Sequence, residues 1–150
     1  MNENTRKNIN EAISAADEAL EYLYEARKYL GKAGRLGILD MFGGGFIIGM
    51  TKHKRLDAAN ASLRQAKASL MKFNKELHDI PGYTTESFGD GFRSADASTN
   101  AFLQDVLSDN MLSDYLVQES LNDTRDRNEK LIEQIEITRG ILKDKLMAEE

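Results

Sequence analysis

Apolar residues recur at alternating spacings of three and four along this chain, and this period constrains the fold more than any other feature. The longest unbroken run follows this spacing at Leu56, Ala59, Leu63, Ala66, Leu70, Phe73, Leu77 and Ile80. Such a repeat places every member on one face of an α-helix and is typical of helices that pack lengthwise against a partner. It predicts a long helix with one narrow buried stripe.

An earlier repeat predicts a second long helix. Its members are Ile9, Ile13, Ala16, Leu20, Leu23, Arg27 and Leu30. Ala12, Ala19 and Ala26 recur every seven residues beside it, so a neighbouring helix can approach closely. Gly31 is expected to end this helix, because glycine commonly follows the last helical turn.

The C-terminal region predicts a short helix and a long one, separated by a break at Asp109–Asn110, because Asn tolerates the left-handed conformation that ends helices. The seam of the longer helix consists of Val117, Leu121, Thr124, Asn128, Leu131, Ile135, Thr138 and Leu142. Its polar members predict looser packing or a polar contact that fixes the register of the helices.

These patterns predict one all-α domain over residues 1–150, an elongated antiparallel bundle built on a long coiled-coil-like hairpin, with three long helices and one short helix. The expected helices span about 3–30, 46–80, 98–109 and 111–147, with a glycine-rich apolar turn at 31–45 and an irregular linker at 81–97. Pro81–Gly82 ends the second helix. The composition, 41% apolar and 30% charged, suits long helices with narrow apolar stripes.

Residues 36–50 form the most unusual part of the chain, which we call the glycine-rich apolar segment. A loop at a hairpin tip is normally polar, and this one is too short to cross a bilayer as a helix. The expected interaction residues are Leu36, Ile38, Leu39, Met41, Phe42, Gly43, Gly44, Gly45, Phe46, Ile47, Ile48, Gly49 and Met50. The basic residues that flank them are Arg35, Lys52, Lys54 and Arg55.

Three uses of this segment remain open. It could be covered by the acidic, aromatic stretch 83–119, because residues 1–80 carry 13 basic and 10 acidic side chains whereas residues 81–150 carry 7 and 15. It could be a docking surface for another protein or a second copy. It could instead touch an anionic membrane surface, which attracts nearby Lys and Arg.

The run Gly-Ile-Leu-Asp-Met-Phe-Gly-Gly-Gly-Phe-Ile-Ile-Gly-Met-Thr-Lys-His-Lys-Arg-Leu-Asp at 37–57, with Asp-Tyr-Leu-Val-Gln at 114–118, resembles segments of uncharacterised bacterial helical-hairpin proteins. The resemblance covers about a fifth of the chain. It implies a helical hairpin with this segment as a feature of the fold, and it implies no activity.

Several kinds of chemistry find little support in the sequence. The chain has no Cys, so thiol nucleophiles, disulfides and thiolate metal sites are absent. Gly44–Thr51 lacks the Gly-Lys-Ser/Thr ending of a phosphate loop, with Met50 where Lys should stand. His53, Asp57 and Asp40 are weak candidates for a metal site, for which an ordinary surface ion pair is the simpler interpretation. No catalytic set and no cofactor-binding motif is visible.

The sequence therefore does not specify a function. It favours a non-enzymatic protein interaction module, a helical adaptor or self-associating scaffold whose partner is another protein or a second copy. The alternative is a peripheral membrane-binding hairpin, and a metal-dependent enzyme comes third. We expect no small-molecule substrate, no nucleic-acid partner given the acidic balance, and a cytoplasmic location that could include the membrane periphery.

Overall fold

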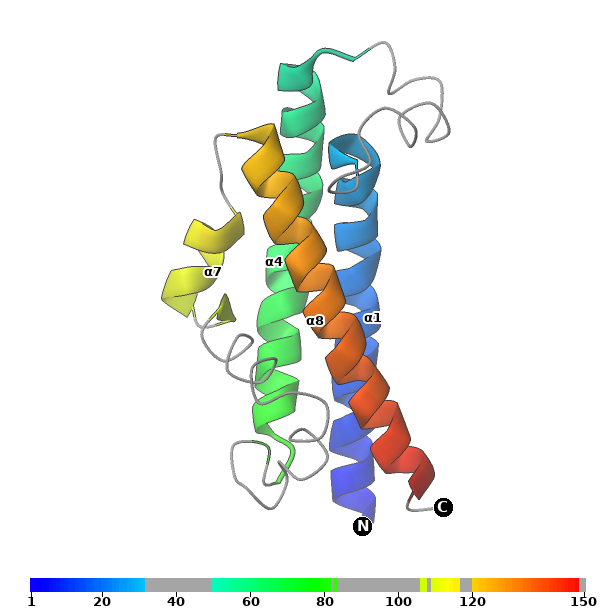
Figure 1. Ribbon diagram of the computed structural model, residues 1–150. Helices are drawn as coiled ribbons and strands as arrows, with labels where there is room; N and C mark the ends of the chain where they lie inside the picture. The colour runs from blue at the N-terminus through cyan, green and yellow to red at the C-terminus, as the bar shows by residue number, and fades with distance from the viewer. Residues whose placement is uncertain (32–49, 82, 84–105, 108, 117–119, 149–150) are drawn as a thin grey trace.

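The computed structural model describes residues 1–31, 50–81, 83, 106–107, 109–116 and 120–148, and these residues form four helices and no strand (Figure 1). The helices are α1 (Glu3–Leu30), α4 (Lys52–His78), α7 (Asp109–Leu116) and α8 (Leu121–Ala148). The expected all-α bundle with three long helices and one short helix is confirmed.

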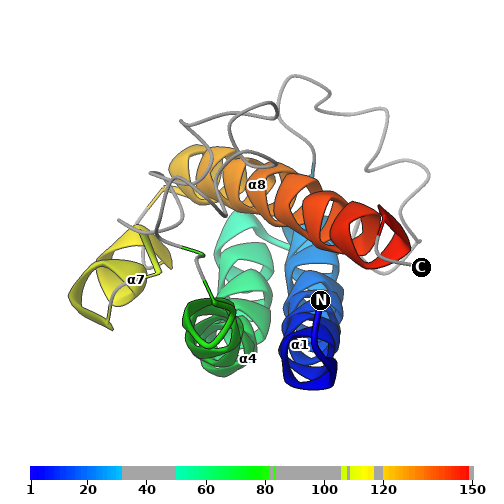
Figure 2. The ribbon, with the colours of Figure 1, turned by 90° about the horizontal axis from the view of Figure 1, so that it is seen from below.

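α1 and α4 run antiparallel and side by side, and they form the hairpin that the two strongest repeats predict (Figures 1 and 2). α1 begins after Asn2, whose side chain accepts a hydrogen bond from the Thr5 backbone N–H at 2.7 Å. It ends at Leu30, where Gly31 adopts a φ of 81° and its N–H bonds to the Arg27 carbonyl. A side chain would be strained at this φ, so the expected stop at Gly31 is confirmed.

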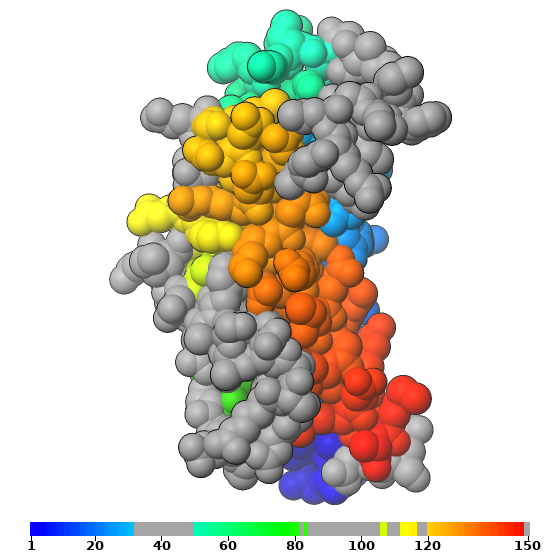
Figure 3. All heavy atoms as spheres, viewed as in Figure 1, coloured from blue at the N-terminus to red at the C-terminus, as the bar shows by residue number. Residues whose placement is uncertain are grey.

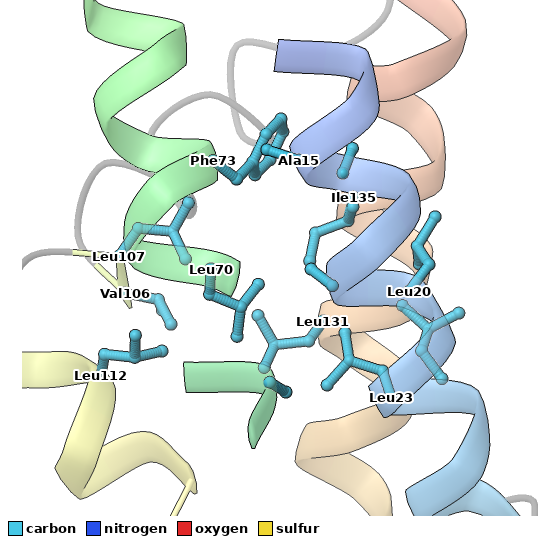
Figure 4. Close-up of a cluster of buried hydrophobic side chains, with 14 of the residues drawn as sticks. Ala15, Leu20, Leu23, Leu70, Phe73, Val106, Leu107, Leu112, Leu131 and Ile135 are labelled. Carbon is cyan, nitrogen blue, oxygen red and sulfur yellow. The ribbon is translucent and has the colours of Figure 1, made fainter. Parts of the chain in front are cut away.

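α8 forms a second layer across the hairpin (Figure 2). It starts on the α4 side, ends on the α1 side, and packs more closely against α1 than against α4. Leu131 and Ile135 of α8 point into the same apolar cluster as Leu23 of α1 and Leu70 of α4 (Figure 4). α7 lies beside α4 and closes one flank of this cluster.

The predicted stripes are buried in the structure. In α1 and α4 every described member is buried except Ile13, Arg27 and Leu56, which are half-buried. Ala12, Ala19 and Ala26 have no exposed surface, as expected for residues that allow close approach of a neighbouring helix. The α8 seam is buried from Thr124 to Leu142, including its polar members.

Two expected boundaries are wrong. The second helix begins at Lys52 instead of about residue 46, because Thr51 is extended and its hydroxyl caps the helix by accepting from the Lys54 N–H. The break expected at Asp109–Asn110 is the start of α7, and α8 begins only at Leu121. The observed short helix is therefore not the one expected at 98–109, and most of that expected range lies outside the described residues. Asp at a helix N-terminus is favoured by the helix dipole, so this pair opens a helix more readily than it ends one.

Candidate functional site

The end of the hairpin where α1 stops and α4 starts is the candidate site. Both helices reach the same end of the molecule (Figure 1), so the glycine-rich apolar segment connects them there. Of its residues only Met50, which is half-buried, belongs to the described part of the chain. Residues 36–49, together with Arg35 and Asp40, lie outside the described residues.

The first turn of α4 is strongly cationic. Lys52, His53 and Lys54 are exposed at the extreme end of the molecule, where the start of α4 projects (Figure 3). No acidic residue occurs in this turn. The N-terminus of a helix carries partial positive charge from its free N–H groups, so these cations are in the least favourable position along the helix. The same arrangement attracts an external anionic group.

Arg55, the fourth basic residue expected to flank the segment, faces the hairpin instead. Its Nε donates to the backbone carbonyl of Tyr29 at 2.9 Å. This carbonyl lies in the last turn of α1, where helix carbonyls lack partners within the helix. Arg55 therefore ties the end of α1 to the start of α4, and among the described flanking residues Lys52 and Lys54 are the exposed ones.

His53 and Asp57, two of the weak metal candidates, contact each other. Nε2 of His53 lies 3.3 Å from Oδ2 of Asp57, and the two side chains are 85% and 63% exposed. They are one turn apart on α4 and form a surface pair, which is the simpler interpretation considered from the sequence. The described residues contain no group of three or more His, Cys, Asp or Glu side chains suited to a metal ion.

The described part of the acidic stretch 83–119 lies away from this end. Tyr83 follows the opposite end of α4, where its ring meets His78 edge-on at 5.4 Å. Val106, Leu107 and Leu112 lie beside Leu70 (Figure 4). Leu70 is about 18 residues after Lys52, which is ~27 Å along the helix. These side chains therefore cover the middle of the hairpin. Residues 84–105 lie outside the described residues.

A second polar feature, which we call the α1–α8 polar seam, joins the two layers. It comprises Arg27–Glu129, with Nε to Oε1 at 2.6 Å, Arg139–Asp17 at 2.9 Å and Tyr24–Glu136 at 3.2 Å. Arg27 is the charged member of the predicted α1 repeat, but nothing in the sequence indicates its partner. The position of α8 along α1, which creates these pairs, is set by the tertiary packing.

Asn128 provides the polar contact that the polar members of the α8 repeat predict. Its Nδ2 donates to the buried backbone carbonyl of Leu23 at 3.0 Å. Thr124 and Thr138 instead donate to the carbonyls four residues earlier in the chain, those of Ser120 and Gln134. Of these three side chains, the amide of Asn128 is therefore the one that reaches across to α1, and the threonines satisfy their hydroxyls locally.

Burial and the contact with Glu136 affect the pKa of Tyr24. Burial, followed by the negative charge of Glu136 and the hydrogen bond to it, raises the pKa of Tyr24 above its ordinary value. The raised pKa keeps Tyr24 a hydrogen-bond donor to Glu136 to higher pH than an exposed tyrosine.

None of the described helices combines the length and the apolar character needed to cross a membrane. Comparison of the chain with protein-family models, with curated proteins and with solved structures found no match.

Proposed function

We propose that the chain is a non-enzymatic interaction module, a helical scaffold that presents the glycine-rich apolar segment to a partner protein or a second copy. One observation carries the proposal: Lys52 and Lys54 are exposed in the first turn of α4, at the end of the hairpin where α1 stops and α4 starts. The partner would combine an apolar surface with acidic groups.

The cations have no evident role in stabilising α4 itself. Their charge opposes the dipole of the helix that carries them, which typically costs ~0.3–1 kcal/mol for a charge of the wrong sign at a helix end. Thr51 already supplies the N-cap. A sequence selected for stability alone would favour acidic residues at these positions. Binding of an anionic partner would explain why lysines occupy them instead.

The rest of the described surface offers little apolar area for docking. Its large apolar side chains that are exposed are Met1, Met71 and Met147. Met1 and Met147 are close to the two chain termini, which lie at the same end of the molecule, opposite the start of α4 (Figure 1). Three methionines contribute little apolar area, and single exposed apolar residues are normal on a protein surface. The apolar residues of segment 36–50 are therefore the best candidates for contact with a partner.

A photo-crosslinking amino acid at Phe46 in the full-length chain tests this proposal in cells. We expect discrete crosslinked products, either with a second copy or with a particular protein, that weaken in Lys52→Glu/Lys54→Glu. The matched control Lys72→Glu/Lys75→Glu makes the same change in charge on exposed residues farther along α4. Products that are equally strong with the photo-crosslinker at exposed Lys72, or no product at all, contradict the proposal.

A membrane surface is the second candidate, because the start of α4, which carries the exposed Lys52 and Lys54, lies at the tip of an elongated molecule (Figure 3). Flotation with vesicles containing phosphatidylserine tests it. We expect binding that weakens as salt is added, because charge attraction to anionic lipid is screened, and that is lost in Phe46→Asp. No flotation at low salt removes this candidate and leaves the protein partner.

A further inference from the structure

A groove lies between α4 and α7. α7 is anchored on α4 by Leu112, which is fully buried beside Leu70 (Figure 4). Next to this contact the two helices leave a hollow of about 190 Å³. The described residues that line it are Asn60, Leu63, Arg64 and Lys67 of α4 and Ser113 and Leu116 of α7. At ~30 Å³ for each water molecule, the groove has room for about six waters, which is enough for part of a small ligand.

The floor of the groove is apolar and small. Leu63 and Leu116 belong to the hydrophobic core and expose only 3% and 6% of their surface. The α7 side adds Ser113, whose short side chain leaves space that a larger residue would occupy. So little apolar surface cannot hold a protein partner, but it can cover the tail of a small ligand.

The α4 wall of the groove is cationic. Asn60, Arg64 and Lys67 recur at spacings of four and three, which places them on one face of the helix. Arg64 is exposed, Lys67 is half-buried, and none of the described residues that line the groove is acidic. Within the described part of the chain, no hydrogen bond or ion pair engages either cationic side chain. Two like charges one turn apart repel each other, so an anionic group placed between them is stabilised.

Two other hollows of the described surface lack this pattern. One lies beside the first turns of α1 and mixes Glu3 and Glu11 with Lys7. The other surrounds the pair of Arg27 and Glu129. In both, side chains of opposite sign lie near one another, so their charges are balanced without an external ion. The groove between α4 and α7 instead combines an apolar floor with charges of one sign.

We infer that this groove binds a small amphiphilic carboxylate, of the chemical class of a medium-chain fatty acid. The apolar tail lies on Leu63 and Leu116, and the carboxylate accepts hydrogen bonds from Arg64 and Lys67 at the rim. A guanidinium can hold a carboxylate through two parallel hydrogen bonds, so Arg64 contributes orientation as well as charge.

The size of the groove limits the ligand. Pockets for drug-sized ligands measure ~300–1,000 Å³, and this groove is smaller, so it suits a tail of about six to eight carbons. The inference does not rest on the proposed function. Asn60, the lining residue nearest in sequence to the start of α4, is eight residues after Lys52, which is ~12 Å along the helix.

Octanoate is the probe for this site. The isotopically labelled full-length chain is titrated with sodium octanoate, and its backbone amide chemical shifts are followed by NMR. We expect saturable shifts at Leu63, Ser113 and Leu116, with a Kd on the order of 1 mM for a ligand of about ten non-hydrogen atoms. Octan-1-ol, which lacks the charge, and butyrate, which lacks the long tail, should each bind about tenfold more weakly.

Matched variants locate the binding. Arg64→Glu/Lys67→Glu reverses the cationic wall and should weaken octanoate binding about tenfold or more. Lys52→Glu/Lys54→Glu makes the same change in charge at the start of α4, on the residues that carry the proposed function. At ~0.15 M salt, which screens charges at that separation, it should leave octanoate binding unchanged. Ser113→Leu fills the groove and should abolish binding.

The charge-reversal variant changes side chains at the surface, so it decides the inference even if Ser113→Leu fails to fold. Shifts that stay linear with octanoate up to ~20 mM would overturn the assignment. Saturable shifts confined to the start of α4, equal binding of octan-1-ol, or equal binding by Arg64→Glu/Lys67→Glu would overturn it as well.

Discussion

Arg27 joins α1 to α8 by donating to both carboxylate oxygens of Glu129, while its guanidinium lies 5.4 Å from the centroid of the Tyr24 ring. The two members of the pair are separated by 102 residues in sequence. Both side chains are about three-quarters buried, with 25% and 23% of their surface exposed. A bidentate pair that is largely shielded from water is stronger and more geometrically specific than an exposed ion pair.

Glu129→Gln should lower the free energy of unfolding by about 1–2 kcal/mol, because one charge-assisted bond is lost and Arg27 stays partly buried without its counter-charge. Urea denaturation followed by circular dichroism measures this change. Asp57→Asn is the matched control, since it removes the exposed pair with His53 and should change stability by less than ~0.5 kcal/mol. Equal effects of the two variants would contradict the importance of shielding.

Ala19→Leu should destabilise the bundle by ~1–3 kcal/mol, because Ala19 has no exposed surface and the added isopropyl group must displace packed neighbours. Ala68→Leu introduces the same side chain on an exposed position of α4 and should change stability by less than ~0.5 kcal/mol. Thermal unfolding compares the two. Unchanged stability of Ala19→Leu would show that the helices approach less closely than the structure indicates.

Lys54→Glu should stabilise α4 while weakening association with a partner. Thr51 is the N-cap and residue 54 is the third residue of the helix, where Glu completes a capping box and also suits the dipole. We expect a gain of ~0.5–1 kcal/mol in the free energy of unfolding. The photo-crosslinking assay at Phe46 should lose product in the same variant. A loss of stability would refute the electrostatic argument on which the proposed function depends.

Alkaline pH should destabilise the protein through its buried tyrosines. Burial raises the pKa of Tyr83 to about 12 and that of Tyr115 to about 12, the latter against the opposing charge of Arg127. Because the folded pKa exceeds the unfolded value of 10.0, this stabilisation is complete below pH 10 and is lost as the pH rises toward about 12. For Tyr83, which is 2% exposed, the loss is on the order of 2–3 kcal/mol.

Ultraviolet absorbance of tyrosinate measures this titration cleanly, because the chain has five Tyr and no Trp. Tyr83→Phe should remove one late-titrating group and flatten the fall in stability above pH 10. If tyrosinate formation is complete before the loss of helical circular dichroism begins, neither side chain is shielded from water as described.

The helices were predictable from the sequence because helical periodicity is a local property. Leu56 to Ile80 repeat at helical spacing whatever surrounds them, and burial of Leu63, Leu70 and Phe73 follows from that repeat alone. The end of α1 at Gly31 was also predictable from the local sequence, because a positive φ favours glycine in any context. The start of α4 was predicted too early. The spacing of the repeat continues back through residues 45–52, and it does not reveal that Thr51 caps the helix.

The sequence alone could not predict which residues that are distant in the chain pair with each other. Nothing near Arg27 indicates Glu129, and nothing near Arg55 indicates that it bonds the Tyr29 carbonyl instead of facing solvent. The contact of Arg27 with Glu129 exists because α8 crosses the hairpin at one particular register, where Leu131, Ile135 and Asn128 pack together against it. The contact of Arg55 with Tyr29 exists because α1 and α4 pack antiparallel, which brings the start of α4 beside the end of α1. The sequence by itself determined which helix faces are apolar, because the helical repeat is a short-range property of the chain. Only the tertiary structure decided which charges meet, because that depends on how three helices fill one core.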